Sequence, residues 1–218
     1  MRIAVLGTGE VGRRLGGKLV ELGHQVTLGS RSPDHPGATE WAARHRAAHG
    51  TFAAAAGGAE LVVNATGGLV SLAALESAGA ENLAGKVLVD VSNPLDFSQG
   101  MPPRVVTPDG GSVAEQIQRA FPAARVVKTL NTMSNTVMTD PARVPGEHVV
   151  FVCGDDPAAR TVVTDLLRSF GWPDGRILDL GDLTAARGTE LVLPLWLRLY
   201  GTFGTAEFNF AVPRAPGT

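Results

Sequence analysis

Residues 2–12 read RIAVLGTGEVG and decide the fold of this 218-residue chain. The first five are a short apolar run that a glycine ends, which predicts a buried parallel strand. Gly7, Gly9 and Gly12 then follow the spacing G-x-G-x-x-G, directly after the strand and at the start of a helix. In that context the pattern predicts a turn that binds the phosphates of a dinucleotide. The alternative is a tight structural turn in an unrelated α/β protein.

Each glycine of this turn has its own role. Gly7 permits the tight turn, Gly9 lets the backbone approach the pyrophosphate, and Gly12 lets the helix pack close to the strand. The pyrophosphate is expected on the free N–H groups at the positive end of the helix dipole. The residues between the glycines should line the pocket through their backbone: Thr8, Glu10 and Val11.

The pattern continues as alternating strands and helices. Apolar residues at helical spacing over 10–22, a glycine at 23 and a strand at 25–28 complete a βαβ unit. Further strands are expected at 51–52, 60–65, 86–91, 125–130, 148–152 and 176–179. Further helices are expected at 39–49, shortly after 52, and at 69–78, 112–121, 156–170 and 183–200, with a Pro- and Gly-rich loop over 93–111.

These elements predict an α/β fold: a doubly wound, Rossmann-like parallel sheet with a small, mainly helical C-terminal part. Residues 1–150 are expected to form the nucleotide-binding domain. Residues 151–218 are expected to complete the sheet and cover it with helices.

Composition limits the classes of function. A net charge of −2 argues against a nucleic-acid partner. No stretch predicts a secretory leader or a membrane span, so we expect a cytoplasmic protein. Cys153 is the only cysteine, which excludes an intrachain disulfide, and it follows an apolar run that predicts a buried strand end rather than a nucleophile.

The end of the second strand reads Gly29-Ser30-Arg31-Ser32, where a carboxylate that binds the ribose hydroxyls would select NAD. Two hydroxyls and a guanidinium suit a 2′-phosphate instead, because arginine carries a permanent charge and a fork of donors. The stretch therefore predicts NADP. The alternative is a solvated loop in which Arg31 stacks on adenine without contacting the phosphate.

With these segments in place, the chain resembles the NADPH-dependent coenzyme F420 reductases, the F420H2:NADP oxidoreductases. The segments that carry the resemblance are Val5-Leu6-Gly7-Thr8-Gly9, Leu22-Gly23-His24, Gly29-Ser30-Arg31, Cys153-Gly154-Asp155-Asp156, Leu178-Asp179-Leu180-Gly181, Glu190 and Pro194. The resemblance implies a homo-oligomer that transfers a hydride directly between nicotinamide and a stacked deazaflavin ring. It implies that Thr8, Ser30 and Arg31 bind NADP. It also implies that Ala65, Thr66 and Gly67 border the ribose and nicotinamide.

Hydride transfer between two stacked rings needs orientation and exclusion of water rather than an acid or base. Accordingly, the sequence offers no catalytic triad, carboxylate pair or metal-ligand spacing. The best site candidates are polar residues where predicted strands end: Asn93, Pro94 and Asn131, with Ser92 and Thr132 undecided. The alternative is that these side chains cap their own loops.

Two further features stay open. Lys128 could point into a cleft toward an anion, or it could be an edge lysine that discourages strand pairing. The segment 191–200 is apolar on all sides, which favours a homodimer with this helix and the tail 203–212 in the interface, and with Leu195 or Trp196 beside the acceptor. Burial within its own chain is the alternative.

The sequence thus predicts an NADP-dependent oxidoreductase that uses coenzyme F420 as second substrate. The alternatives are reduction of another acceptor, namely a flavin, a quinone, a ferric chelate or an imine. A non-catalytic NADPH-binding protein is a third possibility.

Overall fold

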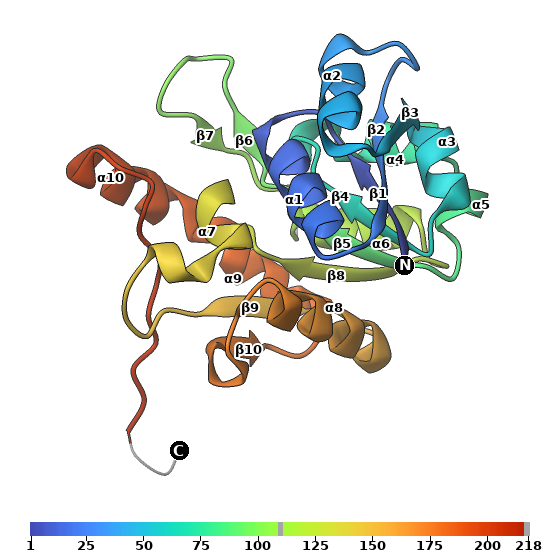
Figure 1. Ribbon diagram of the computed structural model, residues 1–218. Helices are drawn as coiled ribbons and strands as arrows, with labels where there is room; N and C mark the ends of the chain where they lie inside the picture. The colour runs from blue at the N-terminus through green and yellow to red at the C-terminus, as the bar shows by residue number, and fades with distance from the viewer. Residues whose placement is uncertain (109–110, 216–218) are drawn as a thin grey trace.

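The computed structural model of the protein describes residues 1–108 and 111–215. Helices cover both faces of one eight-stranded sheet with the order β10-β9-β8-β5-β4-β1-β2-β3 (Figure 1). Its strands are β1 (Arg2–Leu6), β2 (Gln25–Ser30), β3 (Ala48–Thr51), β4 (Leu61–Asn64), β5 (Val87–Asp90), β8 (Arg125–Thr129), β9 (Val150–Cys153) and β10 (Ile177–Asp179). The predicted Rossmann-like α/β fold is confirmed. The parts of the predicted loop and extension at 109–110 and 216–218 lie outside the described residues.

Side chains alternate between two apolar cores, as the period of two in a strand requires. Ile3 and Val5 of β1 point to the core under α1, α2 and α8, and Ala4 and Leu6 point to the core under α3, α4 and α6. The helices are α1 (Glu10–Glu21), α2 (Pro36–His45), α3 (Phe52–Gly58), α4 (Ser71–Ala78), α5 (Ala80–Leu83), α6 (Val113–Ala120), α7 (Asn135–Thr139), α8 (Pro157–Ser169), α9 (Ala186–Leu191) and α10 (Leu193–Phe203).

The sheet is mainly parallel, as predicted, and only its last part departs from that arrangement. Strand β9 pairs antiparallel with β8, and β10 then runs parallel to β9. After β8 the chain packs α7 against α1 instead of crossing a face of the sheet. The chain therefore re-enters the sheet at the same end of the strands at which it left β8. For this reason β9 runs antiparallel to β8.

Several predicted boundaries were also wrong. The helix expected at 39–49 is α2, which ends at His45 because Arg46 adopts a left-handed φ of 53°, and β3 follows at Ala48–Thr51. The single helix expected over 183–200 is a 3-10 turn (Leu183–Ala185), then α9, then α10 with Pro194 in its first turn. A proline has no N–H to continue a preceding helix, so it starts a new one.

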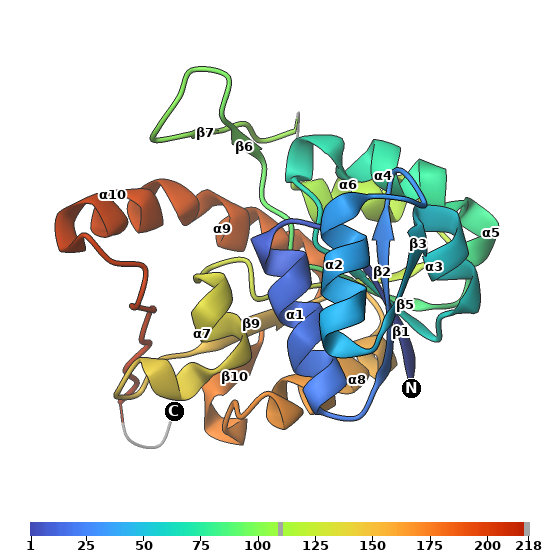
Figure 2. The ribbon, with the colours of Figure 1, turned by 45° about the horizontal axis from the view of Figure 1, so that its top comes forward.

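The Pro- and Gly-rich loop after β5 holds a small hairpin that the sequence did not reveal. Strands β6 (Leu95–Asp96) and β7 (Arg104–Val105) pair antiparallel, and the hairpin stands beside α10 (Figure 2). The short helices α5 and α7 were also missed, as were 3-10 turns at Gly68–Val70, Pro141–Arg143 and Asp174–Arg176. Among the described residues, no helix has the length and hydropathy needed to cross a membrane.

Candidate functional site

The glycine turn between β1 and α1 has the geometry that a dinucleotide phosphate requires. Gly7 has a φ of +121°, and a Cβ on Gly12 would lie 2.0 Å from the Gly7 carbonyl oxygen. Gly9 is the N-cap of α1 without a side-chain cap, and a Cβ placed on it would meet nothing within 4 Å. Open space therefore faces the uncapped N–H groups of the helix, where a pyrophosphate fits.

The Ser-Arg-Ser stretch lies at the carboxyl end of β2, next to this turn. Gly7 N–H donates to the Gly29 carbonyl at 3.0 Å, which joins the two segments. Ser30 is buried, and its hydroxyl lies within hydrogen-bond distance of the carbonyls of Ser32 and Gly50. Arg31 and Ser32 are exposed, and no hydrogen bond or ion pair joins the Arg31 side chain to the described part of the chain. Arg31 and Ser32 thus have the freedom to reach a 2′-phosphate, whereas the Ser30 hydroxyl is held in the turn.

His35 belongs to the same region as the phosphate turn. His35 is half-buried, and its Nδ1 caps α2 by accepting the Ala38 N–H at 3.3 Å. Its Nε2 lies 3.3 Å from the Thr8 hydroxyl. The N-terminus of α2 thereby contacts the phosphate turn.

A cavity of about 630 Å³ opens at the carboxyl ends of β1, β4, β5 and β8. Of the predicted site residues, these line it: Gly9, Glu10, Val11, Ala65, Thr66, Gly67, Asn93 and Asn131. The others do not: Gly7, Thr8, Gly12, Ser30, Arg31, Ser32 and Pro94. Pro94 is buried, and its carbonyl accepts the Val106 N–H at 2.8 Å, so it anchors the loop that carries the β6–β7 hairpin.

The wall opposite the phosphate turn is apolar and aromatic. It comes from the β6–β7 hairpin, the segment around α7 and helix α10: Leu95, Phe97, Met101, Pro103, Met133, Met138, Leu193, Trp196, Leu197 and Tyr200. Trp196 stacks on Tyr200 and on Phe208, with ring centroids 5.6 and 5.2 Å apart. Trp196 lines the cavity, whereas Leu195 is not among the lining residues and is exposed. Most of this wall was missed, because apolar residues in a Pro- and Gly-rich loop carry no periodic signal.

The Thr66 hydroxyl points into the protein rather than into the cavity. Its Oγ1 donates to Asn64 Oδ1 at 2.7 Å and lies 3.0 Å from Ser71 Oγ. A Cβ on Gly68 would meet the Asn93 carbonyl carbon at 2.5 Å, so the loop after β4 lies against the loop after β5. This close approach fixes the floor of the cavity.

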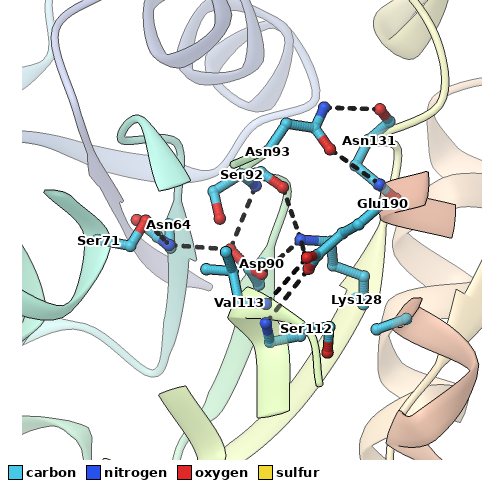
Figure 3. Close-up of polar contacts among 12 residues, drawn as sticks. Asn64, Ser71, Asp90, Ser92, Asn93, Ser112, Val113, Lys128, Asn131 and Glu190 are labelled. Carbon is cyan, nitrogen blue, oxygen red and sulfur yellow. Dashed lines mark hydrogen bonds and ion pairs between the residues drawn. The ribbon is translucent and has the colours of Figure 1, made fainter. Parts of the chain in front are cut away.

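Asn93 and Asn131 form an amide pair at the cavity (Figure 3). Asn93 Nδ2 donates to the Asn131 backbone carbonyl at 2.8 Å. Asn131 Nδ2 donates to Asn93 Oδ1 at 3.1 Å and to the Thr189 carbonyl at 3.0 Å. Leu130, directly before, has a φ of +63°, a strained conformation for leucine that turns Asn131 toward this pair. Because both amide hydrogens of Asn131 are used, its Oδ1 is the group left to accept a ligand N–H.

Beneath the amide pair lies a buried ionic cluster that includes Lys128 (Figure 3). Lys128 Nζ lies 2.8 Å from Asp90 Oδ2, 2.8 Å from Glu190 Oε1 and 2.6 Å from the Ser92 carbonyl. Burial lowers the pKa of Lys128, but the two carboxylates outweigh it and raise the pKa above that of free lysine. Both predicted readings of Lys128 were therefore wrong: β8 is an interior strand, and the lysine binds protein carboxylates instead of a ligand.

The cluster holds one cation and two anions, and the N-terminus of α6 compensates for the excess negative charge. Glu190 Oε2 accepts the Val113 N–H at 2.9 Å, and Oε1 accepts the Ala114 N–H at 3.3 Å. Helix α6 begins with a capping box formed by Ser112 and Glu115, whose spacing of three residues is itself a sequence signal for the start of a helix. Asp90 and Glu190 were not singled out as site residues from the sequence. The available signal was that Asp90, Lys128 and Glu190 are charged residues within apolar runs, with Lys128 opposite in charge to the other two.

In the part of the chain that the structure describes, neither a reactive thiol nor a cluster of metal-binding side chains accompanies the cavity. Cys153 is the buried last residue of β9, and burial raises the pKa of its thiol to about 12. Within the described ranges, no group of three or more His, Cys, Asp or Glu side chains could hold a metal ion.

This sheet, turn and cavity define a dinucleotide-binding protein of the Rossmann class. Over residues 2–94 the chain matches the family described as "NADP oxidoreductase coenzyme F420-dependent". A solved structure from Arthrobacter sp. FB24, assigned as an F420-dependent NADP reductase, is 55% identical with a TM-score of 0.93. The alignment covers 98% of this chain and 100% of that one. The chain therefore belongs to the family of F420-dependent NADP oxidoreductases, which uses NADP and coenzyme F420.

Two curated relatives widen the comparison. The F420-dependent NADP reductase of Methanocaldococcus jannaschii is 35% identical over 121 residues, which are 55% of this chain and 52% of the relative. The metalloreductase STEAP3 of Rattus norvegicus is 32% identical over 199 residues, which are 89% of this chain and 38% of the relative. The chain thus spans about half or less of the length of these two proteins.

Proposed function

We propose that this protein transfers a hydride between NADP(H) and the deazaflavin coenzyme F420. The observation that carries the proposal is the single cavity that joins the phosphate turn at Gly9–Val11 to the apolar wall around Trp196. A dinucleotide whose pyrophosphate lies at the N-terminus of α1 has the nicotinamide in reach of this cavity. The apolar wall offers a flat aromatic surface to a second ring.

The residues of the cavity suit a reaction that needs positioning more than acid–base chemistry. NADPH gives up a hydride and becomes NADP⁺, and the deazaflavin gains that hydride together with one proton from water. Asn131 Oδ1 can accept an N–H of a bound ring, and the methionines and aromatic residues exclude water from the hydride path. Glu10 is the one carboxylate among the described lining residues, and it is exposed to solvent.

The test is anaerobic mixing of NADPH, oxidised F420 and protein, followed by the loss of deazaflavin absorbance. Catalytic loss of absorbance supports the proposal. Turnover with a flavin, quinone, ferric chelate or imine but not with F420 would replace the acceptor. A ferric chelate is the first alternative to assay, because the STEAP3 relative is a metalloreductase. NADPH binding without any turnover would leave a non-catalytic NADPH-binding protein.

NADPH is expected to bind at least about ten times more tightly than NADH. One charged contact between Arg31 and the 2′-phosphate, about 1.5–3 kcal/mol, is sufficient for that ratio. In Arg31→Ala the preference should fall toward one, with NADH affinity unchanged. Titration of both nucleotides into both proteins measures this. Arg44→Ala is the matched control, because Arg44 is an exposed arginine of α2 that pairs with Glu40. Equal affinities in the wild type would refute the NADP assignment.

We also propose a homodimer formed through α10 and the neighbouring hairpin. The helix buries only Leu193 within its own chain, while Leu195, Tyr200 and Phe203 are exposed. Phe97 and Met101 of the hairpin segment are exposed as well. The tail after α10 folds back on its own chain: Phe208 stacks on Trp196, and Val149 N–H donates to the Phe210 carbonyl.

Leu195→Glu is expected to convert this dimer to a monomer, because a partner would have to bury the new charge. Light scattering at micromolar concentration measures the mass. Val162→Glu is the control, since it changes an exposed residue of α8 away from this surface. A monomeric wild type would refute the dimer.

A further inference from the structure

Helix α9 contacts both the sheet and the amide pair, and the helix of the apolar wall, α10, begins two residues after it ends. Glu190 enters the buried ionic cluster, and the Thr189 carbonyl accepts a hydrogen of the Asn131 amide. Helix α10 follows directly and carries Leu193, Trp196, Leu197 and Tyr200 into the cavity wall. We call the part of the cavity lined by Asn93, Asn131 and α10 its ring-binding half. A movement of Glu190 would shift both Asn131 and α10, which lie on two sides of this half.

Glu190 cannot leave its place without a large electrostatic cost. It is fully buried, it lies 2.8 Å from Lys128, and it accepts two backbone N–H groups at the start of α6. Its charge thus fixes α9 against both the sheet and α6. The phosphate turn, in contrast, is formed by β1, α1 and β2, whereas the hydrogen bonds and ion pairs of Asp90, Lys128 and Glu190 go to other segments.

We propose that Glu190 is a positioning residue that sets the geometry of the ring-binding half of the cavity through Thr189 and Asn131. It touches neither substrate. It holds α9 so that the Asn131 amide points Oδ1 at the cavity and α10 closes the opposite wall. This inference rests on the proposed NADP-dependent function, but it concerns how the rings are held rather than which acceptor reacts.

Glu190→Gln is expected to leave the affinity for NADPH nearly unchanged but to impair the positioning of the nicotinamide ring and turnover. The dissociation constant of NADPH should stay within about threefold, since the phosphate turn and Arg31 are intact. The emission change of the bound nicotinamide on NADPH binding should be lost, because the ring is no longer fixed. Turnover should fall about tenfold to a hundredfold, the cost of a misplaced ring, with a larger deuterium isotope effect from NADPH deuterated at C4.

Two further variants test the route of the effect. Asn131→Ser removes the amide and leaves the ionic cluster intact, so it should reproduce the losses of Glu190→Gln. The double variant should then be no worse than the more impaired single variant. Arg187→Gln is the control, because Arg187 joins α9 to Glu115 of α6 at 2.7 Å but does not contact Lys128. It should keep wild-type emission and turnover.

Additive losses in the double variant, equal losses in Arg187→Gln, or a parallel loss of NADPH affinity would overturn the inference. All assays are run well below the unfolding temperature of each variant, so that unfolding is not mistaken for displacement of the bound ring. The emission measurement needs no acceptor. The inference can therefore fail while the hydride transfer stands, and it can be tested if F420 proves to be the wrong acceptor.

Discussion

Replacing Lys128 by methionine is expected to lower the free energy of unfolding by about 3–5 kcal/mol, a large part of the total stability of a domain. Methionine fills most of the lysine volume, so the loss is electrostatic. The side chain is 1% exposed and lies between Asp90 and Glu190, each 2.8 Å away. Without it the two buried carboxylates keep only neutral donors, namely backbone N–H groups for both and the Asn64 amide for Asp90.

Chemical denaturation followed by circular dichroism measures this loss. Lys86→Met is the matched control, since Lys86 is half-buried and its Nζ donates to the Ala56 carbonyl at 2.8 Å, with no carboxylate partner. The control should lose no more than about 1.5 kcal/mol, the net contribution of one hydrogen bond. Adding Asp90→Asn to Lys128→Met should restore part of the stability, because one uncompensated charge disappears. If Lys128→Met unfolds like the control, the cluster contributes little net energy.

The direction of the Lys128 pKa shift sets the pH range of this effect. A lysine whose pKa is raised in the folded protein contributes its stability below the pKa of free lysine and loses it as pH rises through the folded value. The difference between wild type and Lys128→Met should therefore be complete at neutral pH and shrink only in strongly alkaline solution.

The sequence revealed those parts of the site that depend on local spacing. The glycines of the phosphate turn and the apolar run before them lie within twelve residues, and their geometry follows from sterics alone. The capping box at Ser112 is similarly local. Strand direction is not local: an apolar run such as Val150–Cys153 has the same pattern whether it runs parallel or antiparallel to β8.

The ring-binding half depended on contacts that no local pattern encodes. Glu190 meets Lys128 only because α9 folds back over the sheet, and Asn131 finds its acceptor in the Thr189 carbonyl of the same helix. Single residues were predicted at the ends of strands, as for Asn93 and Asn131, because parallel strands end at one edge. Their mutual orientation required the tertiary structure.

Two glycine substitutions in the phosphate turn should separate nucleotide binding from folding. Gly9→Ala is expected to weaken NADPH binding by about a hundredfold or more, as a methyl group occupies the space for the pyrophosphate. Its stability should be unchanged or slightly higher. Gly9 has a φ of −71°, nothing lies within 4 Å of the added Cβ, and alanine restricts the unfolded chain.

Gly12→Ala should instead lower both the affinity for NADPH and the stability of the fold. Its Cβ would lie 2.0 Å from the Gly7 carbonyl oxygen, so the start of α1 must move. Overpacking of this kind costs about 1–3 kcal/mol, and the displaced N–H groups no longer meet the phosphates. Thermal unfolding without nucleotide and NADPH titration of the same samples measure the two effects. If Gly9→Ala binds NADPH like the wild type, the open space at Gly9 does not hold the pyrophosphate, and the nucleotide must lie elsewhere along the carboxyl edge of the sheet.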